Sequence, residues 1–221
     1  MKKSIKIDLG KVVLEGDLTL PSLPKGLIIF AHGSGSGRFS PRNQFVAQHL
    51  NKQKFATFLF DLYESRESEL FRQEFNLELL AARLRDVTRS LKSFPFLAKL
   101  PVGFFGSSTG AAVALVAAAY LKGQIHAVVS RGGRTDLADD FLYLVQASTL
   151  LLAGENDPLI LGYNEESMKL IDAPKALKII PNASHLFEEP GALEAVAAET
   201  STWFESYLGK SQSTVKSHVN L

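Results

Sequence analysis

The feature that most constrains the fold is a repeated alternation of short apolar runs with helical patterns from residue 26 onward. We expect strands at residues 27–31, 55–60, 102–105, 125–129, 149–152 and 176–180. Helical patterns separate most of them, at residues 42–51, 74–91, 109–121, 163–170 and 192–208. Strands that are apolar on both faces and alternate with helices are typical of a mostly parallel sheet with helices on both faces.

The first twenty residues have a different pattern. Residues 4–9 and 12–20 alternate polar and apolar side chains on either side of a Gly-Lys pair, which predicts an N-terminal antiparallel hairpin. A chain of 221 residues with 46% hydrophobic residues can bury one large core, so we expect a single domain over residues 1–208. Residues 209–221 are polar and aperiodic, and we expect them to form a flexible C-terminal tail.

Composition excludes several classes of function. The net charge of +1 and the 21% of charged residues give no indication of nucleic-acid or membrane binding. No apolar run is long enough to span a bilayer, and the residues after Met1 alternate instead of forming a signal-peptide core. The absence of cysteine excludes disulfides, thiolate metal sites and a cysteine nucleophile. We expect a cytoplasmic protein without metal or cofactor, a monomer or small homo-oligomer.

The loop at residues 106–110 reads GSSTG and matches G-x-S-x-G, the turn that presents a nucleophilic serine between a strand and a helix. In such a turn the backbone two residues to either side of the serine comes too close to its neighbours to carry a Cβ. Ser108 has glycine at both places, whereas Ser107 would have Phe105 and Thr109 there. We therefore predict that Ser108 is the nucleophile. The alternative is a serine that only caps the helix.

A serine nucleophile needs a base and an acid that orients the base, and in this class they follow in the order Ser, Asp or Glu, His. Asp157 and His185 each come after a separate predicted strand, in that order. Asp157 is preferred over Glu155 because Pro158 fixes the chain beyond it and because a shorter carboxylate is easier to hold. The alternatives are a turn-capping Asp157 and a surface-loop His185.

Residues 32–38 read HGSGSGR and follow the first buried strand. The glycine spacing does not fit a dinucleotide-binding fingerprint, and the loop lacks the Lys of a phosphate-binding Walker loop. A His-Gly pair followed by small residues fits the loop that donates an N–H to a developing oxyanion. We predict the amides of Ser34 and Thr109 as the two donors, and His32 as a satisfied buried histidine.

Four arginines lie on loops at the carboxyl ends of the strands, where parallel sheets bind ligands: Arg38, Arg42, Arg131 and Arg134. Each could bind a substrate carboxylate or phosphate, or tie loops together by pairing with Asp61, Asp136 or Glu64. We expect one of the four to face the substrate. Arg131 is favoured because Gly132 and Gly133 let its loop fold over Ser108, and Arg38 is the second candidate.

With these motifs the chain resembles the α/β-hydrolase superfamily over residues 10–208. Six motifs resemble its dienelactone-hydrolase-like branch, at residues 32–38, 40–43, 106–110, 130–134, 154–158 and 183–185. The resemblance implies an α/β-hydrolase fold without a large cap, and hydrolysis of carboxylic esters or lactones. Dienelactone hydrolase proper uses a cysteine nucleophile, whereas position 108 here is serine.

Only residues 130–148 are available for a cap, enough for a loop and a short helix around 137–145, so we expect an open site for small soluble substrates. The predicted function is a serine hydrolase of small esters or lactones that acts through an acyl-enzyme on Ser108. The alternatives are a non-catalytic receptor or interaction module on the same fold, and an acyl or peroxyacid transferase.

Overall fold

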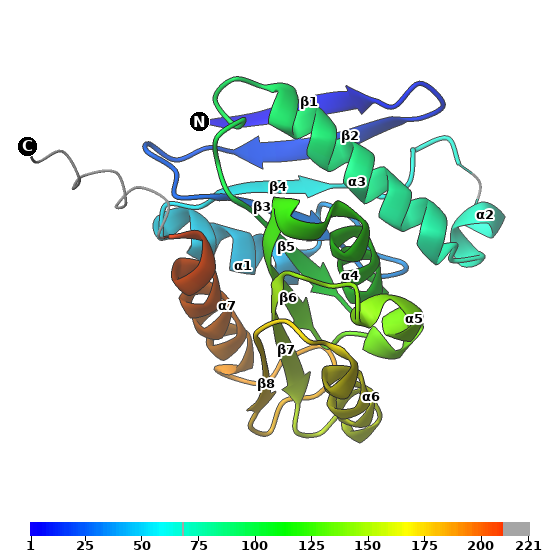
Figure 1. Cartoon of the computed structure of the whole chain (residues 1–221), viewed down its shortest axis with the longest axis vertical. Helices are drawn as coiled ribbons and strands as arrows, with labels where there is room; N and C mark the ends of the chain where they lie inside the picture. The colour runs from blue at the N-terminus through cyan, green and yellow to red at the C-terminus, as the bar shows by residue number, and fades with distance from the viewer. Residues whose placement is uncertain (68, 210–221) are drawn as a thin grey trace, which may run out of the picture.

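The computed structural model describes residues 1–67 and 69–209. A mixed sheet with the strand order β1-β2-β4-β3-β5-β6-β7-β8 runs through the molecule (Figure 1). The strands are β1 (Lys2–Asp8), β2 (Val13–Thr19), β3 (Leu27–Ala31), β4 (Ala56–Phe60), β5 (Val102–Ser107), β6 (Ile125–Arg131), β7 (Ser148–Gly154) and β8 (Lys175–Ile180). The predicted strands are thus all present.

The sheet has a parallel body and an antiparallel edge. Strands β3 to β8 pair in parallel, while β2 pairs antiparallel with both β1 and β4. The antiparallel hairpin predicted from residues 4–9 and 12–20 is therefore confirmed. Three strands are longer at their carboxyl ends than predicted, since β5 continues to Ser107, β6 to Arg131 and β7 to Gly154.

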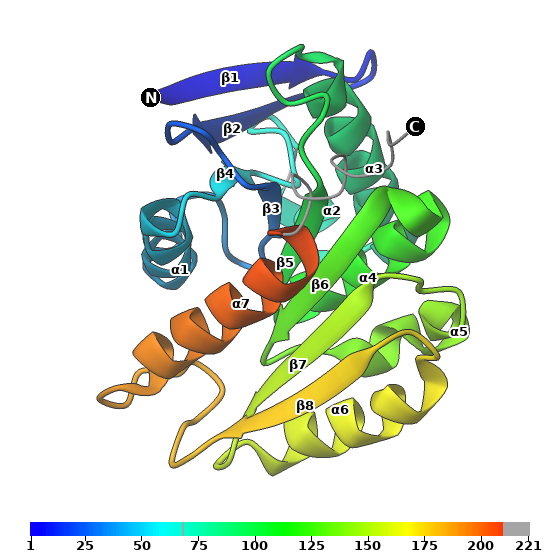
Figure 2. The same cartoon turned by 60° about the vertical axis from the view of Figure 1, so that its left-hand side comes forward.

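Helices cover both faces of the sheet, as predicted. On one face lie α1 (Pro41–Lys52) and α7 (Ala192–Leu208), and on the other lie α3 (Leu77–Ser93), α4 (Thr109–Leu121), α5 (Asp139–Leu142) and α6 (Pro158–Leu170) (Figures 1 and 2). The short α2 (Glu69–Gln73) was not predicted. Two 3-10 turns, η1 (Lys122–Gln124) and η2 (Thr135–Ala138), complete the elements.

The ends of two helices follow from local chemistry. Helix α3 begins later than predicted because the side chain of Asn76 caps it, accepting a 2.9 Å hydrogen bond from the amide of Leu79. Helix α6 begins earlier than predicted, at Pro158, because a proline fits the first position of a helix.

Helix α4 lies at the centre of the packing and positions the residues before it. Its small apolar residues are buried almost along its whole length, between β5 on one side and α3 on the other. A helix that is apolar all round belongs in a core. Its N-terminus, which follows Ser108 directly, is therefore held rigidly against the sheet.

The connection from β6 to β7 holds only η2 and α5, so among the described residues no large cap is inserted there over the carboxyl edge of the sheet. Within the described residues, no helix combines the length and the apolar character that a membrane crossing requires. Of the tail predicted at residues 209–221, Gly209 ends α7, and the remainder lies outside the described residues.

Candidate active site

The turn at Ser108 is as tight as the sequence predicts. Strand β5 ends at Ser107 and α4 begins at Thr109, so Ser108 alone makes the turn, with φ 52° and ψ −124°. A Cβ on Gly106 would lie 2.5 Å from the Cα of Ala111, and one on Gly110 would lie 2.3 Å from the carbonyl oxygen of Ala31. Neither position can carry a side chain. A serine at positive φ is strained, and such strain persists only where the surroundings enforce it.

The loop after β6 encloses this turn. The amide of Ser108 donates to the carbonyl of Arg131 at 3.1 Å, and the amide of Arg134 donates back to the carbonyl of Ser108 at 3.1 Å. Gly132 has φ 54°, which a loop of this shape favours. The loop therefore folds over Ser108, as its glycines predict.

Three predicted side chains meet at the carboxyl edge of the sheet. The Nδ1 atom of His185 lies 2.7 Å from Oδ2 of Asp157, and its Nε2 atom lies 3.3 Å from Oγ of Ser108. They come from the ends of β5, β7 and β8. Nδ1 donating to the carboxylate leaves Nε2 free to accept the proton of the Ser108 hydroxyl.

The structure also separates the two acidic candidates. The side chain of Asp157 makes no capping bond to α6 and is turned to His185 instead. Glu155 accepts a 2.7 Å hydrogen bond from the amide of Asn182. The side chain of Asp157 is 14% exposed and that of His185 is 37% exposed, so the acid is shielded while the imidazole can reach a ligand.

The two predicted oxyanion donors lie against each other. The amide of Ser34 donates to Oγ1 of Thr109 at 2.9 Å, and the two hydroxyls are 3.0 Å apart. A Cβ on Gly33 would lie 3.1 Å from the Cβ of Ser108, so the loop backbone runs beside the serine. Thr109 is the first residue of α4, and the first amides of a helix have no acceptor within it. The amide of Ser34 is thus occupied by a hydroxyl that can rotate away.

His32 is a satisfied buried histidine, as predicted. Its Nδ1 lies 2.9 Å from the carbonyl of Gly33, and its Nε2 accepts a 2.9 Å hydrogen bond from the amide of Leu62. Burial lowers the pKa of His32 below its ordinary value of 6.5. The ring is therefore neutral at pH 7 and ties the loop after β3 to the segment after β4.

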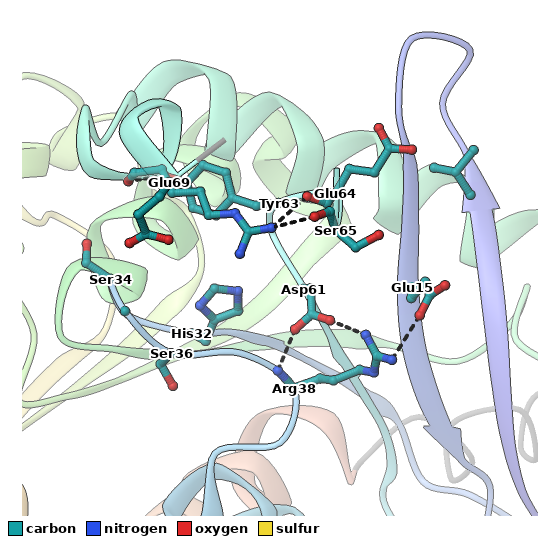
Figure 3. Close-up of a pocket in the computed structure, with 13 residues that line it drawn as sticks. Glu15, His32, Ser34, Ser36, Arg38, Asp61, Tyr63, Glu64, Ser65 and Glu69 are labelled. Carbon is teal, nitrogen blue, oxygen red and sulfur yellow. Dashed lines mark hydrogen bonds and ion pairs between the residues drawn. The ribbon is translucent and has the colours of Figure 1, made fainter. Parts of the chain in front are cut away.

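A cavity of about 680 Å³ lies between these two segments. The loop after β3 contributes His32, Ser34, Ser36 and Arg38, and the segment after β4 contributes Asp61, Tyr63, Glu64, Ser65 and Glu69 (Figure 3). Ser108, Asp157 and His185 are not among its lining residues. Ser34 lines the cavity and donates its amide hydrogen bond to Thr109, the residue after Ser108. Sequence reasoning missed this cavity, because the residues that form its second wall match no motif.

The predicted ligand-binding arginines differ in how they are paired. Arg38 donates from its amide to Asp61 at 2.8 Å and pairs through its side chain with Asp61 and with Glu15, the latter at 2.9 Å (Figure 3). Its guanidinium is thus already engaged by Asp61 and Glu15, and its Nε atom lies 4.0 Å from Oδ2 of Asp17. Arg42 pairs with Glu188 and Arg134 with Asp136, at 2.7 and 2.8 Å. Arg38 ties two segments together through the predicted Asp61, and Arg42 does so through Glu188, which was not predicted. Arg134 pairs within its own loop, and Arg131 makes no ion pair with a carboxylate of the described residues.

A mostly parallel eight-stranded sheet with an antiparallel N-terminal edge, and a strained serine between β5 and α4, defines an α/β hydrolase. No protein-family model matches the sequence. The structure of dienelactone hydrolase from Anabaena variabilis is 46% identical, with 94% of this chain and 98% of that chain covered and a TM-score of 0.91. The chain therefore belongs to the dienelactone-hydrolase-like branch of the α/β-hydrolase superfamily.

More distant structures share the fold alone. The structure of Est1E from Butyrivibrio proteoclasticus is 17% identical, with a TM-score of 0.80 over 92% of this chain and 98% of that chain.

Two proteins of Mycobacterium tuberculosis strains, each named "Putative phosphoribosyl transferase", are 48% identical over 206 residues. The match covers 93% of this chain but 46% of theirs, so the chain spans about half the length of these curated relatives.

Proposed function

We propose that this protein is a serine hydrolase that cleaves small carboxylic esters or lactones through an acyl-enzyme on Ser108. The observation that carries the proposal is the continuous contact from Asp157 through His185 to Ser108, made by residues from three separate loops. Such a constellation is recognised by its geometry and its roles rather than by sequence position. The three residues act together as a catalytic triad.

The chemistry follows from the direction of the hydrogen bonds. Oγ of Ser108 attacks the carbonyl carbon while Nε2 of His185 takes the hydroxyl proton, and Asp157 stabilises the imidazolium that forms. The separation of 3.3 Å between Nε2 and Oγ is long for this bond, and such contacts tighten when substrate binds. His185 then returns the proton to the leaving alcohol, and a water molecule releases the acid by the same route.

The amides of Thr109 and Ser34 stabilise the negative oxygen of the tetrahedral intermediate. The Ser34 amide becomes available when the hydroxyl of Thr109, which accepts its hydrogen bond in the free protein, turns toward the substrate oxygen or away from it. A donor of this kind typically contributes about 2.7–4 kcal/mol to the stability of the transition state. The closeness of Gly33 to Ser108 supports this role, because it sets the loop backbone beside the reacting atom.

The open carboxyl edge of the sheet supports small substrates, since only η2 and α5 lie between β6 and β7. The 46% identical relative is named a dienelactone hydrolase, which agrees with ester or lactone cleavage. The mycobacterial relatives are about twice as long as this chain, and the activity in their name is not proposed for it. Acyl or peroxyacid transfer would use the same acyl-enzyme, whereas a non-catalytic receptor would form none.

A fluorophosphonate probe followed by mass spectrometry tests the proposal. We expect the wild-type protein to be labelled on Ser108, and Ser108→Ala to be unlabelled and at least about 10³-fold slower with p-nitrophenyl butyrate. The matched control is Ser107→Ala, which removes a neighbouring buried hydroxyl and should still be labelled. An unlabelled wild-type protein would refute the hydrolase proposal and favour the non-catalytic receptor. Products formed with hydroxylamine or hydrogen peroxide as competing nucleophiles distinguish transfer from hydrolysis.

A further inference from the structure

Asn164 is a buried polar residue that has no part in the chemistry described so far. It lies on α6, about two helical turns after Asp157, and it is fully buried. Its Nδ2 atom donates to the carbonyl of Gly133 at 2.9 Å and to that of Ile160 at 2.7 Å. Because carbonyl oxygens only accept, the nitrogen of the carboxamide must face them, and both of its N–H groups are used. The bond to Gly133 joins α6 to the loop after β6.

The peptide group between Gly133 and Arg134 connects Asn164 to the proposed nucleophile. Its oxygen accepts the hydrogen bond of Asn164, and its N–H, which belongs to Arg134, donates to the carbonyl of Ser108 at 3.1 Å. A hydrogen bond at one end of an amide polarises the amide and strengthens the bond at its other end. The side chain of Asn164 is thus separated from the backbone of Ser108 by a single peptide group.

This peptide group has little freedom to move. A Cβ on Gly133 would overlap Oγ of Ser130 and would lie 2.7 Å from Cβ of Ala111, in the first turn of α4. Helices α4 and α6 lie on the same face of the sheet, and η2 packs against both (Figure 1). A shift at Asn164 is therefore passed on to the residues that hold Ser108, because no empty space is present to absorb it.

The other end of the Asn164 carboxamide lowers stability. Its Oδ1 atom is enclosed and makes no hydrogen bond within the part of the chain that the structure describes. An enclosed polar atom without a partner is destabilising, and a leucine of similar size would avoid that cost. Asn164 is therefore explained better by the two carbonyls that its nitrogen holds than by packing.

We propose that Asn164 is a positioning residue, which holds the turn at Ser108 at a fixed place relative to the helix that begins after Asp157. The inference rests on the proposed function and adds a residue to it. Asp157 orients His185 from the start of α6, and Asn164 ties the same helix to the loop around Ser108. A displacement of about 1 Å at the reacting groups can slow a reaction about 100-fold. Loss of this tie should therefore slow the attack by Ser108 without weakening the binding of a ligand.

Saturation kinetics with the fluorophosphonate probe separate positioning from binding. In this reaction Oγ of Ser108 forms a bond to phosphorus as fluoride leaves, and His185 takes the hydroxyl proton. We expect Asn164→Leu and Asn164→Ala each to lower the maximal rate constant of labelling at least tenfold. The probe concentration that gives the half-maximal rate should stay within twofold of the wild-type value. Leucine fills the site and alanine leaves it open, so an effect of packing alone would differ between the two variants.

The matched control is Ser167→Ala. Ser167 lies about one turn after Asn164 on α6 and is equally buried, but its hydroxyl bonds to Asp139 of α5, at 3.0 Å. We expect Ser167→Ala to keep the wild-type rate constant of labelling, even where urea denaturation shows that it loses as much stability as the Asn164 variants. The inference is overturned if both Asn164 variants keep the wild-type rate constant, or if Ser167→Ala lowers it equally.

Amide hydrogen exchange, followed by NMR, tests the tie without any chemistry. We expect the N–H of Arg134 to exchange at least tenfold faster in Asn164→Leu than in the wild-type protein, relative to the N–H of Phe104 in the central strand β5. In Ser167→Ala this ratio should not change. An unchanged ratio in Asn164→Leu refutes the tie, even where labelling is slower. If the probe does not label the wild-type protein, the proposed function fails, and the exchange of the Arg134 amide alone decides the inference.

Discussion

The two halves of the carboxyl edge of the sheet hold their polar residues by different means. On the side of β5 to β8, backbone contacts place Ser108: two glycines that cannot carry a Cβ, and amide bonds to the loop after β6. On the side of β2 and β4, charged side chains hold the wall of the cavity. Arg38 pairs with Asp61, and Arg83 pairs with Glu67 at 2.5 Å.

The backbone contacts fix the position of Ser108 closely, whereas the ion pairs let the cavity wall adjust. A contact between backbone atoms has no side-chain torsions that could absorb a change, so the turn at Ser108 has essentially one geometry. An ion pair between long side chains can re-form after a small shift, so the segment after β4 can adjust its position beyond Leu62, whose amide is held by His32. The proposed chemistry lies on the rigid side, and the cavity lies at the junction with the adjustable side.

The largest effect is expected from removing the negative charge of Asp157, which orients His185 on the rigid side. Asp157→Asn should lower kcat for p-nitrophenyl butyrate by about 10⁴-fold, because an amide favours the wrong tautomer of the imidazole. The fold should remain intact, since the side chain of Asp157 makes no capping bond. Glu155→Gln is the control and should retain activity. A rate for Asp157→Asn within threefold of wild type would remove Asp157 from the mechanism and make Glu155 the next candidate.

The next effect tests whether the backbone contacts are as intolerant as their geometry indicates. Gly110→Ala should lower the free energy of unfolding by about 3 kcal/mol or more, because the added Cβ would lie 2.3 Å from the carbonyl oxygen of Ala31. Gly162 lies within α6, and no atom of the described residues outside its own helix turn lies within 4 Å of the place that a Cβ would take there. Gly162→Ala should therefore stabilise the protein by about 0.5–1 kcal/mol. Urea denaturation measures both, and equal effects of the two substitutions would contradict the comparison.

The smallest effect concerns the adjustable side. Arg83→Gln should cost about 2 kcal/mol of unfolding free energy, less than the loss of a fully buried pair, because Glu67 keeps some contact with solvent. Arg89, on the same helix, makes an exposed pair with Asp86, and Arg89→Gln should cost less than about 0.5 kcal/mol. Denaturant unfolding at pH 7 makes the measurement. If Arg83→Gln lowered the free energy of unfolding by more than Gly110→Ala does, the assignment of a rigid side and an adjustable side would be wrong.

The same pair gives a pH dependence whose sign is fixed. Burial raises the pKa of Glu67. Hydrogen bonds from Arg83 and from the amide of Glu64 lower the pKa by more than burial raises it, so it lies below its ordinary value of 4.5. The contribution of this carboxylate to stability is therefore present above pH 4.5 and is lost as the pH falls below that value. The difference between wild type and Arg83→Gln should shrink over that range.

The parts of the molecule that the sequence could predict depend on local rules. Apolar runs and helical periodicity predicted every long element, because each buries side chains on a regular spacing. The turn at Ser108 was predictable because two close backbone approaches require Gly106 and Gly110. The meeting of Asp157 with His185 followed from the ends of neighbouring parallel strands lying at one edge.

The parts that the sequence could not predict depend on which side chains meet across the fold. The pairing of Arg38 with Asp61 and Glu15, and the absence of a carboxylate partner for Arg131 among the described residues, are tertiary facts that no spacing encodes. The bond between Ser34 and Thr109 is of the same kind. The short α2 escaped prediction because five residues show no periodicity.

The placement of the three proposed catalytic residues has a consequence for how such proteins diversify. Each follows its own strand, so a loop can lengthen or change its composition without shifting the other two residues. New specificity can then arise by altering the segment after β4 or the part of the β6–β7 connection beyond Arg134, while the catalytic residues stay in place. A scaffold with this division of labour can be copied, varied and joined to other domains with little risk to its chemistry.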